Sequence, residues 1–390
     1  MASYISSNDN RFYAAIEAAY GQVPAFPAQG RFPAVKLTTK QQNEKTSRKD
    51  KTGTRTFLGD PSGMRRTSTF SLSTYLTGWT DQTREPASGP LFHSALGSAA
   101  SIWSGGTIAS APTPTRLAFV SPHGLNPGQA VSVGGEIRFV SAVVDAQTIQ
   151  MNAPLTLPPS ANTQTGATAT YTPAGDLPSV SIFDCWSPAS AVQRIISGGA
   201  MQEMKVKVNG DFHEFAFSGA AEDIIDSSSF VSGDAGLTTF PVEPAAGLLN
   251  YTIIPGHLGQ IWLGSAPNQF CTVTKAELTF QNDLVLRNHE FGCDLAEGIM
   301  QGMRTVSLEF SLFEQDDAKT KELYQAARQR SPISVMLQLG QQQGQLFGIY
   351  MKSVVPEVPD FDDSEKQLQW HFVNCRAQGG LNDEIYVAFG

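Results

Sequence analysis

The chain has little that would hold a metal ion, a redox centre or a membrane. Its four cysteines are far apart and form no Cys-x-x-Cys pair, which argues against a zinc site or a redox motif. Charged residues make up only 16% of the sequence, and the net charge of −9 argues against a nucleic-acid binder of the usual basic kind. No apolar run is long enough to span a bilayer, and residues 1–21 lack the apolar stretch of a secretion signal. We therefore expect a protein that is made in a cytoplasm and contacts no membrane.

Catalytic motifs are also missing. The six histidines show no metal-ligand spacing, and the sequence has no phosphate-binding loop, dinucleotide-binding loop or nucleophile elbow. Asp211, His213 and Glu214 come nearest to a catalytic group, but on a strand Glu214 points away from the other two. His123 has no ligand-type neighbours in the sequence, so we expect it to end a turn. These patterns predict no enzyme activity and no cofactor.

Short alternating segments make up much of the sequence. The length of 390 residues suits two or three domains, and the abundance of Gly, Ser, Thr and Pro favours β structure. Residues 34–42 and 65–76 have the period-two pattern of strands. Asn209-Gly210, between two alternating runs, predicts a hairpin. We therefore predict a mainly β fold.

Three segments predict helices. Residues 8–20 would place Phe12 and Tyr20 on one helical face. Residues 89–98 form a second, short candidate, and residues 316–331 form the most convincing one because their apolar positions share a face.

Residues 104–175 differ from their surroundings. They contain few charges and many Thr, Ala, Pro and Gly residues, with several short strand-like runs. This composition predicts a small all-β module inserted between the strands of a larger domain.

The remainder of the sequence repeats itself weakly. The matched pairs are 34–42 with 275–283, 63–72 with 302–312, and 207–219 with 365–375. In both halves the order is strand, long loop, strand opened by Gly-Met-Arg, short helix and closing strands. Without the inserted module about 320 residues remain, enough for two units of ordinary domain size. We therefore predict a duplicated domain.

These patterns divide the chain into five parts. The parts are an N-terminal helix and arm (1–33), a first domain (34–103 and 176–225), the inserted module (104–175), an interdomain linker (226–257) and a second domain (258–390).

Two long loops and the C-terminal strand are the candidate interaction sites. The first loop is mostly basic in an acidic protein, which favours docking on an acidic surface of another subunit, although a solvated loop has the same composition. The second loop is more apolar and more acidic, and the C-terminal alternation predicts a sheet edge that continues across subunits. The residues are Lys45, Arg48, Lys49, Lys51, Arg55 and Asp60 in the first loop, Arg287, His289, Glu290 and Asp294 in the second, and Ile385, Val387 and Phe389 at the C-terminus.

This order of elements resembles the tail tube proteins of siphophage-type tails. The resemblance rests on the N-terminal helix, the Gly-Met-Arg strand after a long loop, the Leu-Tyr-Gln-Ala-Ala-Arg helix at 323–328 and the closing hairpin, and it covers nearly all of the chain outside 104–175. It implies two tandem tube domains, each a β-sandwich or barrel with a short flanking helix, and an immunoglobulin-like module on the outside.

The resemblance also implies how such a chain assembles. Inner strands would join neighbours into rings, and the loops 43–62 and 284–301 would stack the rings into the hollow tail tube of a virion. A duplicated chain would need three copies for a pseudo-six-fold ring, with hexamers as the alternative. DNA would pass non-specifically through the lumen, which an acidic lining would favour. A tape measure protein and tail-end proteins are the implied partners.

Other interpretations fit the same patterns. The tube of a contractile tail or of an injection machine shares the fold, although an outward module would obstruct a sheath. A receptor-binding or carbohydrate-binding virion protein made of β modules would show clustered aromatic residues, whereas the five tryptophans are scattered. An all-β hydrolase is the remaining alternative.

Overall fold

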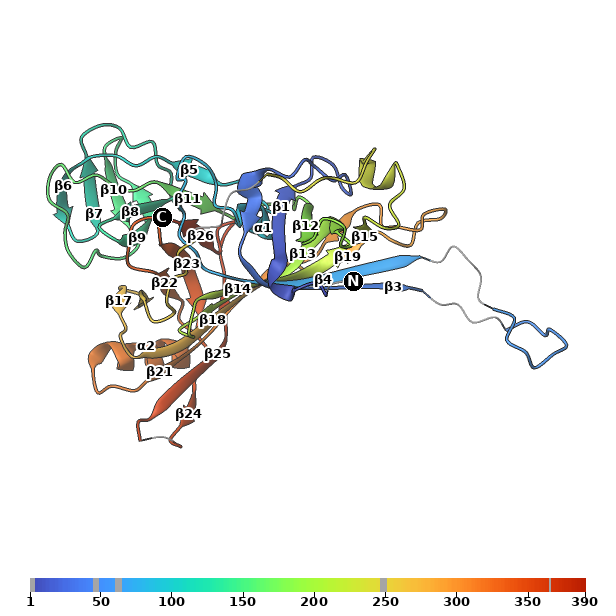
Figure 1. The fold of residues 1–390 in the computed structure, drawn as a ribbon. Coiled ribbons are helices and arrows are strands. Elements are labelled where there is room, and N and C mark those ends of the chain that lie inside the picture. Colours follow the sequence, from blue (N-terminus) through green and yellow to red (C-terminus); the bar gives the residue numbers. More distant parts are fainter. Residues whose placement is uncertain (1–3, 45–48, 60–64, 246–250, 365) are drawn as a thin grey trace.

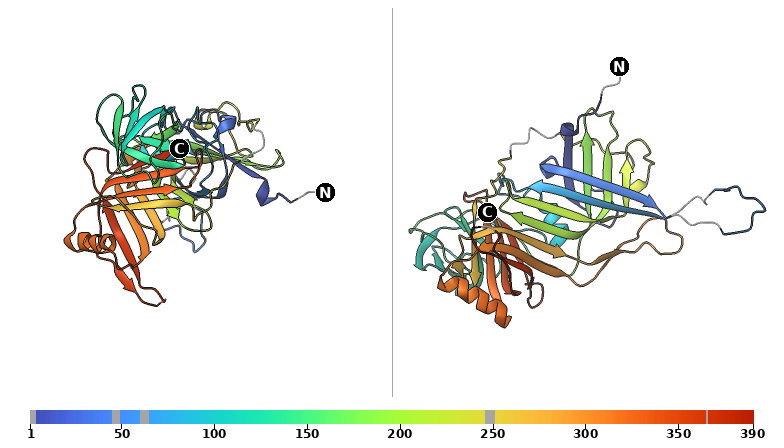
Figure 2. Two further views of the ribbon diagram at one scale, coloured as in Figure 1. Left: turned by 90° about the vertical axis from the view of Figure 1, so that its left-hand side faces the viewer. Right: turned by 90° about the horizontal axis from the view of Figure 1, so that it is seen from below.

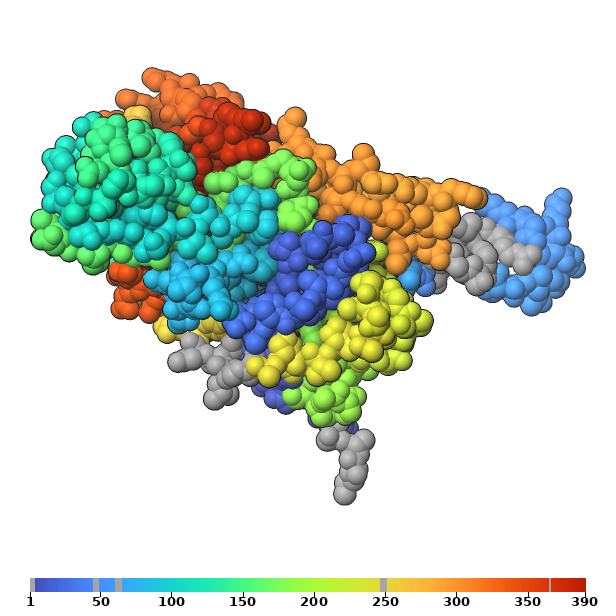
Figure 3. All heavy atoms as spheres, turned by 90° about the horizontal axis from the view of Figure 1, so that it is seen from above, coloured from blue at the N-terminus to red at the C-terminus, as the bar shows by residue number. Residues whose placement is uncertain are grey.

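Antiparallel strands are the main regular structure of the protein (Figure 1). The computed structural model describes residues 4–44, 49–59, 65–245, 251–364 and 366–390. This part of the chain contains two α-helices among many strands, so the predicted mainly β fold is confirmed. A lobe of five strands lies at one end of the molecule, and a long arm projects from the other end (Figures 1 and 3).

The elements fall into three groups. The first unit contains β1 (Asn10–Ile16), β2 (Arg31–Phe32), β3 (Ala34–Asn43), β4 (Arg66–Tyr75), α1 (Gly89–Leu96), β12 (Val180–Trp186), β13 (Arg194–Val208), β14 (Glu214–Ala221) and β15 (Asp223–Asp226). The module contains β6 (Ile108–Thr113), β7 (Arg116–Phe119), β8 (Ala130–Val133), β9 (Glu136–Val143) and β10 (Thr148–Met151), flanked by β5 (Ser101–Trp103) and β11 (Thr168–Tyr171). The second unit contains β16 (Gly259–Gly264), β17 (Asn268–Gln269), β18 (Val273–Gln281), β19 (Leu284–Leu286), β20 (Ile299–Gln301), β21 (Thr305–Phe313), α2 (Ala318–Gln329), β22 (Ile333–Leu339), β23 (Phe347–Val355), β24 (Asp360–Asp362), β25 (Gln369–Ala377) and β26 (Tyr386–Phe389).

Two of the three predicted helices are present. In α2 the Asp317 side chain accepts a hydrogen bond from the Thr320 N–H (2.8 Å) and so caps the first turn. Leu323 and Ala327, which lie on one face of α2, are buried. α1 is shorter and almost wholly buried, and it ends at Gly97, whose φ of +98° suits glycine.

The predicted helix at 8–20 is wrong, because most of this segment is the strand β1. β1 lies between β12 and β2, and four consecutive residues from Phe12 to Ala15 are buried. Phe12 packs into the main core, whereas Tyr13 packs with Phe183 on the opposite face of the sheet. A strand that is covered on both faces reads as a continuous apolar run, so its sequence shows no period of two.

Apart from β19, β20 and β24 of the second unit, which have no separate counterpart in the first, the two units have the same strand order and the same strand pairing. Every pairing is antiparallel, and α1 and α2 occupy the same place in the order. The equivalent pairs are β1–β2 with β16–β17, β1–β12 with β16–β22, β12–β13 with β22–β23, β13–β15 with β23–β26, β13–β14 with β23–β25, β14–β4 with β25–β21, and β3–β4 with β18–β21.

The short sequence matches do not follow this equivalence residue by residue. Leu37 lies opposite Leu72 in the first unit, whereas Leu278 lies opposite Leu308 in the second. The sequence matches pair Leu72 with Leu312 instead, four residues away in register. The likeness of the two units is therefore one of topology, and the short matches do not define a common register.

The two units share one long sheet. Strand β13 bends near Gly198, whose φ of +61° lies in the left-handed region. Before the bend β13 pairs with β12, and after it β13 pairs with β14 on one side and with β18 of the second unit on the other. The result is a sheet with the order β3-β4-β14-β13-β18-β21-β25-β23 (Figure 2), which is here called the shared sheet.

The inserted module has its own five-stranded sheet and its own apolar core. Its two ends meet where the Gly106 N–H donates to Thr165 Oγ1 (2.7 Å) and the Thr165 N–H donates to the Gly106 carbonyl (2.9 Å). β11, which lies within the predicted range 104–175, is not part of this five-stranded sheet and pairs with β5 and with β26 of the second unit.

The second unit has three layers because the module covers its outer sheet. Along β22, Val335 and Leu337 point into the core beneath the shared sheet, whereas Met336 points to the module. The module contributes Ile137 and Phe139 to that contact. The module therefore lies on the opposite side of the core from the shared sheet.

Candidate assembly surfaces

The shared sheet leaves one face open. Its inner face carries large apolar side chains such as Leu72, Phe217 and Leu308, which are buried in the core. The alternate residues point to the open face, and the strand registers place them in rows that cross both units. One such row is Lys36, Ser73, Ala216, Lys205, Thr279, Ser307 and Arg376.

Small polar side chains and balanced charges characterise the open face. Lys205 Nζ lies 3.6 Å from Glu203 Oε1 and 3.7 Å from Glu277 Oε1, so cations on this face are matched by carboxylates. An acidic lining, as the family resemblance implies for a lumen, is not found on this face. Its charged residues include Lys36, Lys40, Lys205, Lys207, Lys275 and Arg376 on one side, and Glu203, Glu214, Glu277 and Glu309 on the other.

A hollow of about 570 Å³ lies near one end of the open face, and Ser311 and His371, which line it, form a Ser-His-Asp contact that the sequence did not reveal. Ser311 Oγ lies 2.7 Å from His371 Nδ1, and His371 Nε2 lies 3.5 Å from Asp362 Oδ2. However, the backbone of Ser311 is paired on both sides, with Lys275 and with His371. Acyl transfer requires N–H groups that stabilise an oxyanion, and the strand that carries Ser311 presents no such pair. We interpret the contact as a cross-strand tie that holds β24 to the shared sheet.

The histidines singled out from the sequence make contacts with the backbone. His213 is buried, and its Nε2 lies 2.9 Å from the Leu258 carbonyl oxygen, while burial lowers its pKa. Asp211 is exposed, so it forms no group with His213. His123 accepts a hydrogen bond from the Leu125 N–H (2.9 Å), and its Nε2 lies 3.1 Å from the Asp145 carbonyl oxygen.

The described part of the first loop lies in the projecting arm (Figure 1). In the described part, residues 49–59, the side chains of Lys49, Lys51 and Arg55 are exposed. The apolar residues Phe57 and Leu58 are exposed as well, with 74% of Phe57 accessible. Three other residues predicted for this loop (Lys45, Arg48 and Asp60) lie outside the described residues.

The second loop lies against the base of the first. The Arg65 guanidinium donates to the Glu290 carbonyl oxygen (3.1 Å) and lies 3.3 Å from His289 Nδ1. The Arg66 N–H donates to the Asp294 carbonyl (3.1 Å), and Arg287 forms an ion pair with Glu290. The structure thus brings the residues predicted for the second loop together beside the arm. Arg65 belongs to the first Gly-Met-Arg motif, the signal that could have pointed to this contact.

The C-terminal strand is not a free edge, so that prediction is wrong. β26 pairs with β23 on one side and with β11 on the other, and Ile385, Val387 and Phe389 are buried. The alternation of apolar residues correctly indicated one buried face. It carried no information about whether the backbone edges were already paired within the chain.

The free edges of the shared sheet lie elsewhere. Among the described residues, β3 pairs with β4 alone, and its outer side has no partner strand. At the other end of the sheet, Val355 and β24 pair with β25 and, among the described residues, have no partner strand on their outer side, whereas Val354 is paired there with Ile333 of β22.

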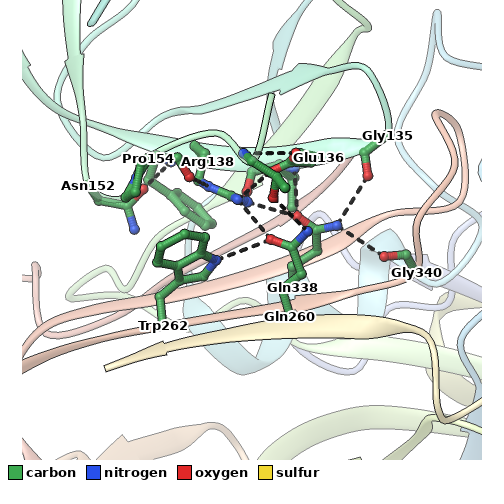
Figure 4. Close-up of polar contacts among 12 residues, drawn as sticks. Gly135, Glu136, Arg138, Asn152, Pro154, Gln260, Trp262, Gln338 and Gly340 are labelled. Carbon is green, nitrogen blue, oxygen red and sulfur yellow. Dashed lines mark hydrogen bonds and ion pairs between the residues drawn. The ribbon is translucent and has the colours of Figure 1, made fainter. Parts of the chain in front are cut away.

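A buried arginine fastens the module to the second unit (Figure 4). Arg138 of β9 is fully buried, and its guanidinium donates to Gln338 Oε1 and to Gln260 Oε1, both at 2.8 Å. It also forms an ion pair with Glu136 and lies 5.3 Å from the centre of the Trp262 ring. Burial lowers the pKa of Arg138 to about 10, which leaves it protonated at neutral pH. The module is inserted in the first unit but docks on the second.

Two carboxyl groups meet at the bend of β13 in the first unit. Glu17 is buried and accepts hydrogen bonds from the Gly21 and Gly198 N–H groups, both at 2.8 Å, and from two serine hydroxyls. Glu222 lies beside it, and its Oε2 is buried with no hydrogen-bond partner among the described residues. Burial and the neighbouring Glu17 raise the pKa of Glu222 to about 7.

Comparisons with known proteins identify no relative of the chain: no protein-family model matches it, and a search of curated proteins found no match. In the described ranges, no cluster of His, Cys, Asp and Glu side chains is suited to hold a metal ion. Neither α-helix of the described chain has the length and the apolar run that a membrane-crossing helix needs.

Proposed function

We propose that the chain is the structural subunit of a hollow virion tube, the tail tube of a siphophage-type tail, and that its two units arose by duplication of one tube domain. The observation that carries the proposal is the shared sheet. Two units that share one strand order and pairing, apart from three additional short strands in the second, are joined edge to edge there, with one polar face open on both. A unit that joins an equivalent unit by its edge builds a ring when the same rotation is repeated until it closes.

The open face suits the wall of a channel for DNA. Tight contacts between phosphates and a basic surface would hold the DNA in place, because each neutralised phosphate adds to the affinity. On the open face, Lys205 is already matched by Glu203 and Glu277 within the same chain. Small hydroxyl side chains fill much of the remainder, so the DNA would meet a polar wall that binds it weakly.

The position of the module supports a tube without a contractile sheath. The module covers the outer sheet of the second unit, on the side of the core away from the open face. A sheath would have to pack against that outer side. In this proposal the partners are further copies of the chain, as trimeric pseudo-hexameric rings or alternatively hexamers, together with a tape measure protein and tail-end proteins.

Negative-stain electron microscopy of the purified full chain tests the proposal. Over a concentration series we expect rings or tubes with a central hole, and class averages along the axis will separate three copies from six. Monomers that persist at the highest concentration, at both low and high salt, would contradict the proposed function.

A further inference from the structure

The joint between the two units provides a template for a joint between copies. Inside the chain, residues 203–208 of β13 pair with residues 276–281 of β18 in antiparallel register. By the equivalence of the units, β3 corresponds to β18, and the end of β23 with β24 corresponds to the end of β13. These equivalents are the two free edges of the shared sheet.

We propose that β3 of one copy pairs with residues 355–362 of a second copy in the arrangement of the internal joint. This inference deepens the proposed function by naming the surfaces that meet. Because a different edge is used on each side, the contact is head-to-tail and repeats until a ring closes. A long exposed edge strand such as β3 is a ready template for pairing with another chain.

The segment 355–362 follows β25 in two pieces, Val355 and β24, with two prolines in the gap between them. Val355 lies opposite Arg376 and Asp360 lies opposite His371, so the register along β25 is unchanged across the gap from 356 to 359. Pro356 and Pro359 stand in this gap, and proline has no N–H for a ladder hydrogen bond. The equivalent part of β13, residues 203–208, contains no proline and is paired on both sides.

The charges of the two free edges are complementary. In the internal joint, Lys207 of β13 lies opposite Glu277 of β18. At the outer edges the signs are exchanged, since β3 carries Lys36 and Lys40 whereas β24 carries Asp360 and Asp362. Opposite charges across a strand pair stabilise the pairing, and like charges oppose it. Charge repulsion therefore disfavours the pairing of β3 with a second β3 and of β24 with a second β24, whereas charge attraction favours the pairing of β3 with β24.

The prolines make the joint between copies weaker than the joint inside the chain. Proline on an edge strand is a common means of limiting unwanted strand pairing. The internal joint is permanent, so the proline-containing edge sets the concentration at which copies associate.

Charge exchange tests the pairing. Lys36→Glu with Lys40→Glu, or Asp360→Lys with Asp362→Lys, is expected to weaken association at least about tenfold in sedimentation velocity, since like charges then face each other. The chain with all four substitutions should associate as the wild type does. Arg84→Glu with Lys321→Glu, two exposed cations away from the edges, is the matched control and should change nothing. Thermal unfolding of each variant checks that it is folded.

Substitution of the two prolines tests whether they weaken the joint between copies. Pro356→Thr with Pro359→Thr should lower the concentration for half-association about tenfold, because the gap then regains backbone N–H groups and can extend the strand. An unchanged value would overturn the role of the prolines.

The outcomes separate this inference from the proposed function. If wild-type rings form and the four charge substitutions have no effect, singly or together, the joint is wrong while the tube proposal is supported. If charge exchange controls an open head-to-tail chain that never closes, the joint is supported and the tube proposal fails. A wild-type chain that stays monomeric at every concentration overturns both.

Discussion

The first and second units have one topology but cover their outer sheets with different segments. In the first unit, the outer sheet around Tyr13 and Phe183 is covered by part of the linker, through Leu237 and Phe240. In the second unit, the equivalent sheet is covered by the inserted module. Both outer sheets are apolar on both faces, and an apolar face must be buried against another layer. The linker and the module therefore have the same structural role in the two units.

Removal of the module tests this comparison with the largest expected effect on stability. A chain without residues 107–164, in which Gly106 is joined to Thr165, should lose about 5 kcal/mol of stability in its second unit, because Trp262, Met336 and Tyr350 lose their cover. Urea unfolding followed by tryptophan fluorescence measures the loss. Leu157→Ser, at an exposed position of the same module, is the control and should be neutral. An unchanged midpoint for the deletion would show that the module only decorates the surface.

Arg138→Met tests the polar part of the same contact. The substitution keeps the length of the side chain but removes one of the donors to Gln260 and to Gln338 and leaves Glu136 without its ion-pair partner, so we expect a loss of about 3 kcal/mol. Arg116→Met, at an exposed position of the module strand β7, should change stability by less than about 0.5 kcal/mol. Equal effects of the two substitutions, measured by denaturant unfolding, would argue against a specific fastening.

Phe240→Ala tests the cover of the first unit. Phe240 is half-buried, and its ring lies 6.0 Å from that of Phe183, so we expect a loss of about 2 kcal/mol. The nearby Val242 is 89% exposed, and Val242→Ala should have no measurable effect in the same thermal unfolding experiment. If both substitutions are neutral, this linker segment does not stabilise the first unit.

Glu222→Gln tests a feature of the first unit and should have the smallest effect. The pKa of Glu222 is raised to about 7, mainly by burial and then by Glu17, so the folded chain binds its proton more tightly than the unfolded chain. The group therefore lowers stability as the pH rises from about 4.5 to about 7. Because the side chain is partly solvated, we expect the glutamine variant to be about 1 kcal/mol more stable at pH 8 and unchanged at pH 4. Equal stability of variant and wild type at both pH values would contradict the raised pKa.

Local patterns in the sequence predicted local structure well. The period-two segments around Leu37 and Phe70 are strands, the Asn209-Gly210 turn joins two paired strands, and the segment around Leu323 is a helix. These features depend on side chains that are near each other in the sequence, which is why periodicity and turn chemistry detect them.

Features that depend on distant residues were missed. Four consecutive buried residues in β1 resemble a helical face until the strands on either side are known, and β26 resembles a free edge until β11 is placed beside it. The docking of Arg138 on Gln260 and Gln338 joins residues more than a hundred positions apart. Neither composition nor spacing encodes such a contact, because each residue taken alone has an ordinary neighbourhood in the sequence.

The fastening of the module has a consequence for how such chains can exchange parts. The module is encoded within the first unit, but Gln260, Trp262 and Gln338 that receive it are encoded in the second. A recombination event that transfers residues 106–165 alone would carry the buried arginine to a chain without its acceptors. A transplant of the module therefore succeeds only if the receiving residues of β16 and β22 travel with it, which makes the two distant segments a single heritable part.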